Sequence, residues 1–263
     1  MKREYLYVVI SMLFVLIAAC DDGTVTDSVG DNESNGNGGE PTFSYNHERS
    51  PGASAMDFLR DDDFENLVVE IQFMEGYRPT DEALTNVEQF LNERLNKSSV
   101  TILSPKEIPS GGQEAYSASD VRELEREHRK EFSEEGTLAA YFIVLDGEFS
   151  ESNVLGIAHY NTSMALFGET IRNTSDGLVQ ASRAVIEETV MKHEFGHILG
   201  LVNNGVDMQE NHQDEEHGNH CDVDSCLMYF AVRTTDFFAN LFGGSVPELD
   251  EFCIADLQAA GGR

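Results

Sequence analysis

The stretch His193-Glu194-Phe195-Gly196-His197 decides how the centre of this chain folds and what it carries. Its two histidines are four residues apart, so on an α-helix both imidazoles project from one face and can reach one metal ion. Glu194 lies beside the first histidine, where its carboxylate can hold a metal-bound water and take its proton. The pattern H-E-x-x-H on a helix therefore predicts a hydrolytic zinc site.

The surrounding residues predict a long helix for this stretch. Met191, Phe195, Ile198 and Val202 recur at helical spacing and form one apolar stripe. At about 100° per residue, the two histidines point away from that stripe. We therefore expect a helix over residues 178–202 that buries one side in a core and presents the other side to a cleft.

Upstream of this helix, strand-like and helix-like segments alternate. The expected strands are Leu67–Phe73, Val100–Leu103 and Leu138–Leu145, and the expected helices are Thr80–Leu95 and Ser119–Phe132. Ser117 and Asp120 precede the second helix in a capping-box arrangement. Residues 154–167 hold a further strand, which we expect at an edge. Alternation of this kind predicts an α/β domain with a mixed sheet.

Composition limits the class of partner that the chain can bind. The formal net charge is −31, from 17 basic and 48 acidic residues. Phosphate binding needs basic patches, so this balance argues against a nucleic-acid partner. The acidity fits a solvated surface in an extracytoplasmic setting, and 40% hydrophobic residues suffice for a real core.

The first residues read as a targeting segment. Lys2 and Arg3 give a basic start, and the apolar run over residues 5–19 is shorter than the roughly 20 residues that span a bilayer. The run ends at Cys20 after small residues, which resembles a bacterial lipobox. We expect residues 1–19 to be a lipoprotein signal peptide and Cys20 to carry lipid. An ordinary signal peptide with an incidental cysteine is the alternative.

Residues 20–60 are expected to be a disordered, acidic and glycine-rich tether. Residues 21–40 contain only Val25 and Val29 as aliphatic side chains, too few to offset the entropy of ordering them. The folded domain is then expected over residues 61–263. We expect a protein that is lipid-anchored to the bacterial cell envelope, on the periplasmic side or at the cell surface.

The residues after the two histidines point to a family. Gly200 follows His197 by three residues, where a helix can end and the chain can turn without a Cβ clash. The pattern H-E-x-x-H-x-x-G resembles the metzincin metallopeptidases. In metzincins the third zinc ligand lies three residues after the glycine. Here that position holds Asn203, whose amide is a poor zinc ligand, so another residue must complete the site.

Three later histidines are candidates for that third ligand, namely His212, His217 and His220. The segment from His220 to Met228 reads H-C-x-x-x-x-C-x-M. It resembles the archaemetzincin segment that joins the third ligand histidine to the methionine of the Met-turn. The resemblance implies that His220 is the third ligand, that Met228 lies beneath the metal, and that residues 202–219 are an insertion. His212, in an acidic solvated loop, and His217 stay open as alternatives.

The resemblance also implies a fold and a substrate class. It implies a metzincin-like α/β catalytic domain with a mixed twisted sheet, a long active-site helix, a Met-turn and a C-terminal helix. It implies Zn²⁺ as cofactor and a protein or peptide substrate, and we expect a monomer. A strand near residues 165–167 would pair with an extended substrate. Some metzincins have a catalytic tyrosine two residues after the methionine, but Phe230 holds that place here, so no such role is assigned.

The remaining cysteines admit two interpretations. Beyond Cys20 the chain has Cys221, Cys226 and Cys253. An oxidising compartment favours a Cys221–Cys226 disulfide, with Cys253 a buried thiol on the last helix. Archaemetzincins bind a second, structural zinc through four cysteines that end in C-x-x-C. Here Asp256 stands at the last of these positions, so a Cys3Asp zinc site is the alternative.

Together these features predict a membrane-anchored, extracytoplasmic zinc metalloendopeptidase. Glu194 would be the general base, and His193, His197 and His220 would hold the metal. A zinc amidase that acts on a non-protein amide is one alternative, since its chemistry would be the same. A non-catalytic surface lipoprotein with a degenerate site is the other, and the departure at Asn203 favours it.

Overall fold

The computed structural model describes residues 43–177, 180–239 and 246–263. The predicted signal peptide, Cys20 and most of the predicted tether lie outside the described residues. The strands are β1 (Phe64–Met74), β2 (Ser99–Ile102), β3 (Lys106–Ile108), β4 (Ala115–Tyr116), β5 (Gly136–Leu145), β6 (Glu148–Phe149), β7 (Gly156–Tyr160) and β8 (Ser163–Phe167). The helices are α1 (Ala55–Leu59), α2 (Asp81–Arg94), α3 (Ala118–His128), α4 (Gly168–Thr174), α5 (Arg183–Ile198), a 3-10 helix (Phe230–Arg233), α6 (Thr235–Ala239) and α7 (Glu251–Ala259).

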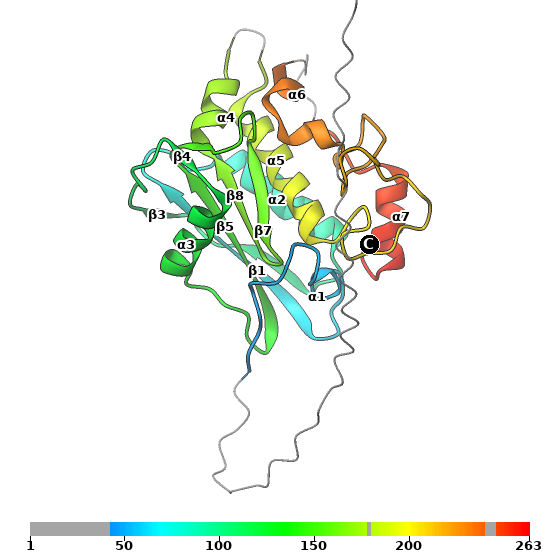
Figure 1. Ribbon diagram of the computed structural model, residues 1–263. Coiled ribbons are helices and arrows are strands. Elements are labelled where there is room, and N and C mark those ends of the chain that lie inside the picture. Colours follow the sequence, from blue (N-terminus) through cyan, green and yellow to red (C-terminus); the bar gives the residue numbers. More distant parts are fainter. Residues whose placement is uncertain (1–42, 178–179, 240–245) are drawn as a thin grey trace, which may run out of the picture. The chain divides into compact units, whose positions relative to one another are not determined.

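A mixed sheet forms the centre of the domain, which confirms the predicted α/β class (Figure 1). Its strand order is β2-β1-β5-β8-β7, with β3 paired to the far part of β1. All pairings are parallel except that of β7 with β8. A short pair, β4 with β6, lies apart from this sheet.

The strand expected at an edge over residues 154–167 proves to be two strands, of which β7 lies at the edge and β8 inside the sheet. Residues 165–167 belong to β8, which lies between β5 and β7, so the edge is β7. Every residue of β8 is buried, as a strand covered on both faces requires, whereas β7 keeps partly exposed positions. The prediction that residues 165–167 pair with a substrate is therefore wrong.

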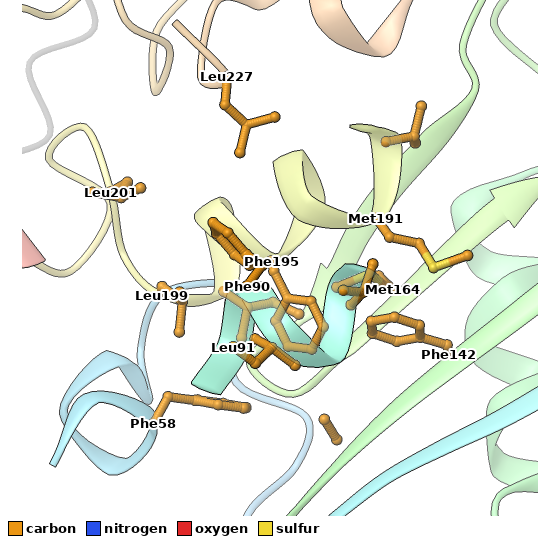
Figure 2. Packing of buried hydrophobic residues seen from close by; sticks show 14 of the residues in the cluster. Phe58, Phe90, Leu91, Phe142, Met164, Met191, Phe195, Leu199, Leu201 and Leu227 are labelled. Carbon is orange, nitrogen blue, oxygen red and sulfur yellow. The ribbon is translucent and has the colours of Figure 1, made fainter. Parts of the chain in front are cut away.

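Two hydrophobic layers cover the two faces of the sheet. One face of β1 and β5 packs against α2 and α5, and the opposite face packs against α3 (Figure 1). In the first layer the rings of Phe142 on β5 and Phe195 on α5 lie 4.9 Å apart (Figure 2). The apolar stripe that contains Phe195 therefore fixes α5 against the sheet, and with it the histidines on the same helix.

The predicted helix starts are confirmed at two capped ends. The Thr80 side chain accepts a hydrogen bond from the backbone N–H of Ala83 at the start of α2. Ser117 and Asp120 form the predicted capping box at the start of α3. Both caps satisfy backbone donors that have no partner inside the helix.

Helix α5 is shorter and more enclosed than its sequence pattern predicts. It begins after Ser182, whose hydroxyl accepts from the backbone N–H of Val185, and ends at Ile198. All its residues from 186 to 198 are buried, because the chain that follows Met228 covers the side away from the sheet. Of the helix, Glu194 and His197 line a cleft, so the side expected to face a cleft is open near the C-terminal end.

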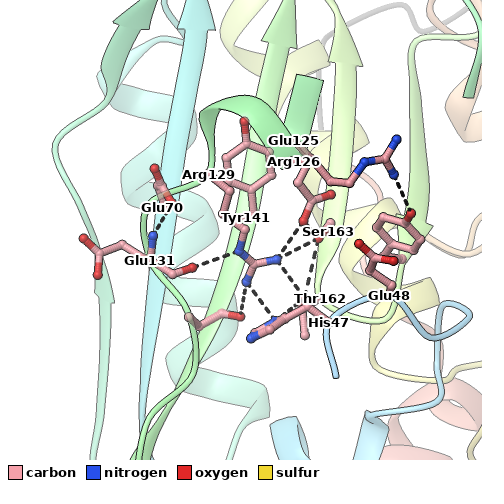
Figure 3. A network of polar contacts seen from close by, with 12 residues as sticks. His47, Glu48, Glu70, Glu125, Arg126, Arg129, Glu131, Tyr141, Thr162 and Ser163 are labelled. Atoms are coloured by element: carbon pink, nitrogen blue, oxygen red, sulfur yellow. Dashed lines mark hydrogen bonds and ion pairs between the residues drawn. The ribbon is translucent and has the colours of Figure 1, made fainter. Parts of the chain in front are cut away.

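The folded unit begins earlier than residue 61. Phe58 and Leu59 of α1 are fully buried in the main core. His47 lies in a buried polar network around the guanidinium of Arg129 (Figure 3). Residues 43–60 supply apolar side chains that residues 21–40 lack, and so the predicted boundary of the tether lies inside the domain. Among the helices of the described residues, none is both long and apolar enough to cross a membrane.

Candidate metal centre

Three imidazoles converge at the C-terminal end of α5. His193 and His197 come from the helix and His220 from the loop that follows it, and their ligand atoms all lie within 4.8 Å of one another. Nε2 of His193 and Nε2 of His197 are 3.2 Å apart. Two nitrogens bound to one tetrahedral zinc ion at about 2.0–2.1 Å would be roughly 3.4 Å apart. The observed spacing therefore suits a single zinc ion.

Backbone carbonyls orient two of these rings. His193 donates from Nδ1 to the carbonyl of Leu227 at 2.7 Å, and His220 donates from Nδ1 to the carbonyl of His217 at 2.8 Å. Each bond leaves Nε2 as the unprotonated nitrogen, which is how metal-ligating histidines are usually held. Nε2 of His220 is buried and has no hydrogen-bond partner in the described part of the chain. A metal ion would satisfy this atom.

The site keeps its histidines neutral. Burial lowers the pKa of His193 to about 3 and that of His220 to about 4, and it holds the pKa of His197 well below the ordinary value. The nearby Arg233 guanidinium adds to each shift. At neutral pH all three imidazoles are therefore unprotonated, as metal binding requires.

Glu194, on the same helix, lines the cleft together with His197 and His220. Its side chain is almost fully buried, and Oε2 accepts a hydrogen bond from the backbone N–H of Ala158 on β7 at 2.7 Å. Oε1 is buried without a partner among the described residues. Burial raises the pKa of Glu194 to about 7, and Arg233 opposes that rise. The carboxyl group is thus poised to exchange a proton near neutral pH.

Met228 lies directly against α5, where the resemblance places a Met-turn. It is fully buried, and a Cβ atom built on Gly196 would lie 2.2 Å from its Sδ. The missing side chain of Gly196 therefore makes room for the methionine between the two histidine turns. Gly200, at a φ of 79°, then ends the helix and lets the chain leave the site.

The other two candidate histidines do not join the three imidazoles. Nδ1 of His217 lies 2.7 Å from Oδ2 of Asp214, and its ring stacks on Phe230 with ring centroids 3.5 Å apart. His212 is 1% exposed, so the expectation of a solvated loop histidine is wrong. Its Nε2 lies 2.8 Å from Oδ2 of Asp256 on α7, because the insertion folds back onto that helix.

The expected Cys221–Cys226 disulfide is not formed. All three cysteines in the described residues are free and buried. They gather in a second cluster, in which Sγ of Cys226 and Sγ of Cys253 are 3.7 Å apart and Nδ1 of His212 lies 3.3 Å from Sγ of Cys221. Cys221 and Cys253 thus share their surroundings with His212, and Cys226 lies beside Cys253.

Asp256 does not take the place that the Cys3Asp alternative gave it. The second potential metal-binding group consists of His212, Cys221, Asp250 and Cys253, whose ligand atoms lie within 4.8 Å of one another. Asp256 instead accepts hydrogen bonds from the backbone N–H of Gln209 and from His212. It therefore holds the insertion and its histidine in place.

Several contributors to the site carry no sequence signal. The N–H of Ala158 and the carbonyls of Leu227 and His217 act through the backbone, which residue types do not reveal. Arg233 lines a cleft of about 340 Å³ together with Glu194, His197 and His220. Arg233 follows Met228 by five residues. This spacing could predict a place in the cleft only if the path of the chain after the Met-turn were known.

Comparison with solved structures shows a likeness of fold. The domain is similar to the crystal structure of archaemetzincin (amzA) from Methanopyrus kandleri at 1.5 Å resolution, with a TM-score of 0.49 and 15% identity. The match covers 76% of this chain and 97% of that chain. No family model matches the sequence, and no curated protein matches it.

Proposed function

We propose that this protein is a zinc-dependent endopeptidase whose active centre is the group of His193, His197 and His220. One observation carries the proposal. Three neutral imidazoles at zinc-ligand spacing share a cleft with a buried carboxylate, and both Nε2 of His220 and Oε1 of Glu194 lack partners among the described residues. Unpartnered buried polar atoms are rare, and here both belong to residues that line the same cleft.

The chemistry follows from the residues that the site holds. Zinc bound by three imidazoles supplies a Lewis acid that lowers the pKa of a water molecule and polarises a carbonyl. Glu194 accepts the proton that the attacking water loses and delivers it to the leaving amine. The N–H of Ala158 holds one carboxylate oxygen and leaves the other free for the proton. His220 supplies the ligand that Asn203 cannot provide.

We propose a structural zinc ion for the second cluster. His212, Cys221 and Cys253 of the potential metal-binding group would hold it. Cys226 would be the fourth ligand in place of Asp250, because its Sγ lies beside that of Cys253 and zinc sites of this kind favour thiolates. Zinc–sulfur bonds of about 2.3 Å place two thiolates roughly 3.8 Å apart, close to the 3.7 Å between Cys226 and Cys253. Asp256 would orient the imidazole from outside, as carboxylates commonly do for zinc-bound histidines. Bound zinc would also keep the thiols from oxidation outside the cytoplasm.

We further propose that the enzyme acts outside the cytoplasm as a lipid-anchored monomer of the bacterial cell envelope, on protein or peptide substrates. The support is the lipobox-like end of the apolar run at Cys20 and the strongly acidic composition. No nucleic-acid partner is proposed, because the charge is unsuitable.

The test of catalysis is a Glu194→Gln variant. It should retain zinc, because the ligands are untouched, and lose hydrolysis by about 100- to 10,000-fold. Casein and cell-wall fragments are assayed side by side with the wild-type protein and with a His217→Ala control. Cleavage of casein supports the endopeptidase, and cleavage of cell-wall fragments alone would favour the amidase. Near-native activity of the Glu194→Gln variant would remove Glu194 from the mechanism.

A further inference from the structure

Arg233 is fixed at the mouth of the cleft by its backbone. It is the last residue of the 3-10 helix that follows Met228, and its carbonyl accepts a hydrogen bond from the N–H of Leu155 at 3.0 Å. Val154 pairs with Thr234 in an isolated bridge directly beside it. These contacts hold the 3-10 helix against the start of β7. The partly buried side chain lines the cleft beside Glu194 and His220.

Among the described residues, none forms a hydrogen bond or ion pair with the guanidinium of Arg233. Every other arginine in the described ranges makes a side-chain hydrogen bond or an ion pair. No hydrogen bond or ion pair links the Arg233 side chain to Glu194 or to any other described residue. The chain has 48 acidic and only 17 basic residues, so carboxylate partners are abundant. Arg233 lines the cleft and has no partner within the described ranges of this acidic chain, so its guanidinium is available for an anion from outside.

The nature of that anion follows from the shape of the guanidinium. Its planar fork matches a carboxylate through two parallel charge-assisted hydrogen bonds. We propose that Arg233 determines substrate specificity by binding a substrate carboxylate close to the bond that is cleaved. The carboxylate belongs either to the C-terminus of a peptide or to an Asp or Glu side chain. This inference relies on the proposed peptidase function, because it takes the cleft as a peptide-binding cleft.

The experiment measures peptide binding separately from cleavage. Binding to the zinc-loaded full chain carrying Glu194→Gln is measured by titration calorimetry, so that no peptide is consumed. The peptides form two matched pairs: one with a free or an amidated C-terminus, and one amidated pair with an internal Glu or Gln. Each pair is titrated into three proteins that all carry Glu194→Gln: one with Arg233 unchanged, one with Arg233→Gln, and a control with Arg78→Gln. Arg78 pairs with exposed Asp81 and does not line the cleft.

The carboxylate peptide of one pair should bind more tightly than its neutral partner, and Arg233→Gln should weaken it by about 10- to 100-fold. The neutral partner should lose little, and Arg78→Gln should change nothing. Dependence on the free C-terminus would assign the site to chain ends, and dependence on Glu would assign it to acidic side chains. Arg233→Lys keeps the charge but not the fork, and should retain part of the preference.

The measured quantity is the ratio of the affinities for the carboxylate peptide and its neutral partner. The inference is overturned if this ratio in the Arg233→Gln or Arg233→Lys protein equals that in the protein with Arg233. It is also overturned if Arg233→Gln, in the chain with Glu194 intact, lowers kcat alone with KM and peptide binding unchanged, since that is the signature of transition-state stabilisation. Carboxylate-dependent binding without any cleavage by the wild-type protein would instead refute the proposed function and leave the carboxylate site standing. Peptide cleavage without any dependence of binding on a carboxylate would support the proposed function and refute the carboxylate site.

Discussion

Gly196 sits between His193 and His197 and lets Met228 approach the helix more closely than any side chain would allow. A Cβ atom there would lie 2.2 Å from Sδ and 3.0 Å from Cε of the methionine. The helix thus accepts a residue of poor helix propensity at its most important turn. The gain is a fully buried, polarizable side chain packed against the two turns that carry the histidines.

A Gly196→Ala substitution should therefore destabilise the protein although alanine favours helices. Overpacking of a filled core costs about 1–3 kcal/mol, more than the helix propensity returns. Urea unfolding of the wild-type protein, Gly196→Ala, Met228→Ala and the double variant gives the coupling between the two positions. In the double variant most of the loss caused by Gly196→Ala should disappear. Equal losses in both backgrounds would show that the two side chains do not meet.

His47, which is not one of the three imidazoles of the metal centre, makes folding stability depend on pH. Burial, together with the neighbouring Arg129, lowers its pKa to about 4, and its Nε2 accepts from the backbone N–H of Ser133. The unfolded chain takes up a proton at a pKa near 6.5, but the folded chain does so only near 4. Between these values the unfolded state binds more protons, so stability falls as pH falls.

The expected loss from His47 is about 2 kcal/mol between pH 7 and pH 5. A His47→Gln variant cannot titrate there, so its stability should fall less over the same interval. Urea unfolding of both zinc-loaded proteins at the two pH values gives the difference. Parallel pH dependence in the two proteins would exclude His47 as the source.

The residues of the candidate site differ in how far the sequence could predict them. His193, Glu194 and His197 are local on one helix, so their spacing alone brings them together. His220 followed only from a resemblance, because no local rule states where a loop of this length returns. The partners of His212 could not be predicted, since they depend on how the insertion packs against α7.

At the scale of elements, local patterns predicted most helices and strands but not their order in the sheet. The caps at Thr80 and Ser117 follow from short-range hydrogen bonds, which the sequence displays directly. The placement of β8 beside β5 depends on contacts between distant segments, and so the edge was misassigned to residues 165–167. The same limit hid the close approach of β7 to α5, which supplies the hydrogen bond to Glu194.

The insertion and α7 form one unit if the second cluster holds zinc. The wild-type protein should then contain two zinc ions per chain after dialysis. His212→Ala should lower the occupancy of the second ion and leave the first, because His212 lies outside the three-imidazole group. Metal analysis by mass spectrometry gives the count, and His217→Ala serves as the exposed histidine control. Two tightly held ions in His212→Ala would remove His212 from the ligand set.

At the scale of the whole molecule, composition and the alternation of strands and helices predicted the α/β class. They did not predict at which residue the folded domain begins. Residues 43–60 look polar in sequence, yet Tyr45, Phe58 and Leu59 bury enough apolar surface to join the core. Composition averages over a window and cannot show which few side chains find partners. The acidic character of the chain, by contrast, is a global property that composition states directly.

The proposed anchor also acts on the whole molecule. Cys20→Ser should release the protein from membranes into the soluble fraction, because the apolar run before it is too short to span a bilayer. Membrane and soluble fractions of cells expressing the two forms are compared by immunoblotting. Unchanged membrane partition of Cys20→Ser would exclude a lipid at this cysteine.

The most direct test of the whole account is an anomalous difference map, collected at the zinc absorption edge, from crystals of the zinc-loaded protein. The account predicts a peak at about 2.0–2.1 Å from Nε2 of each of His193, His197 and His220. Glu194 should face this peak without binding it. A peak held by His212 or His217 in place of His220, or no peak at the end of α5, would contradict the assignment of the active centre.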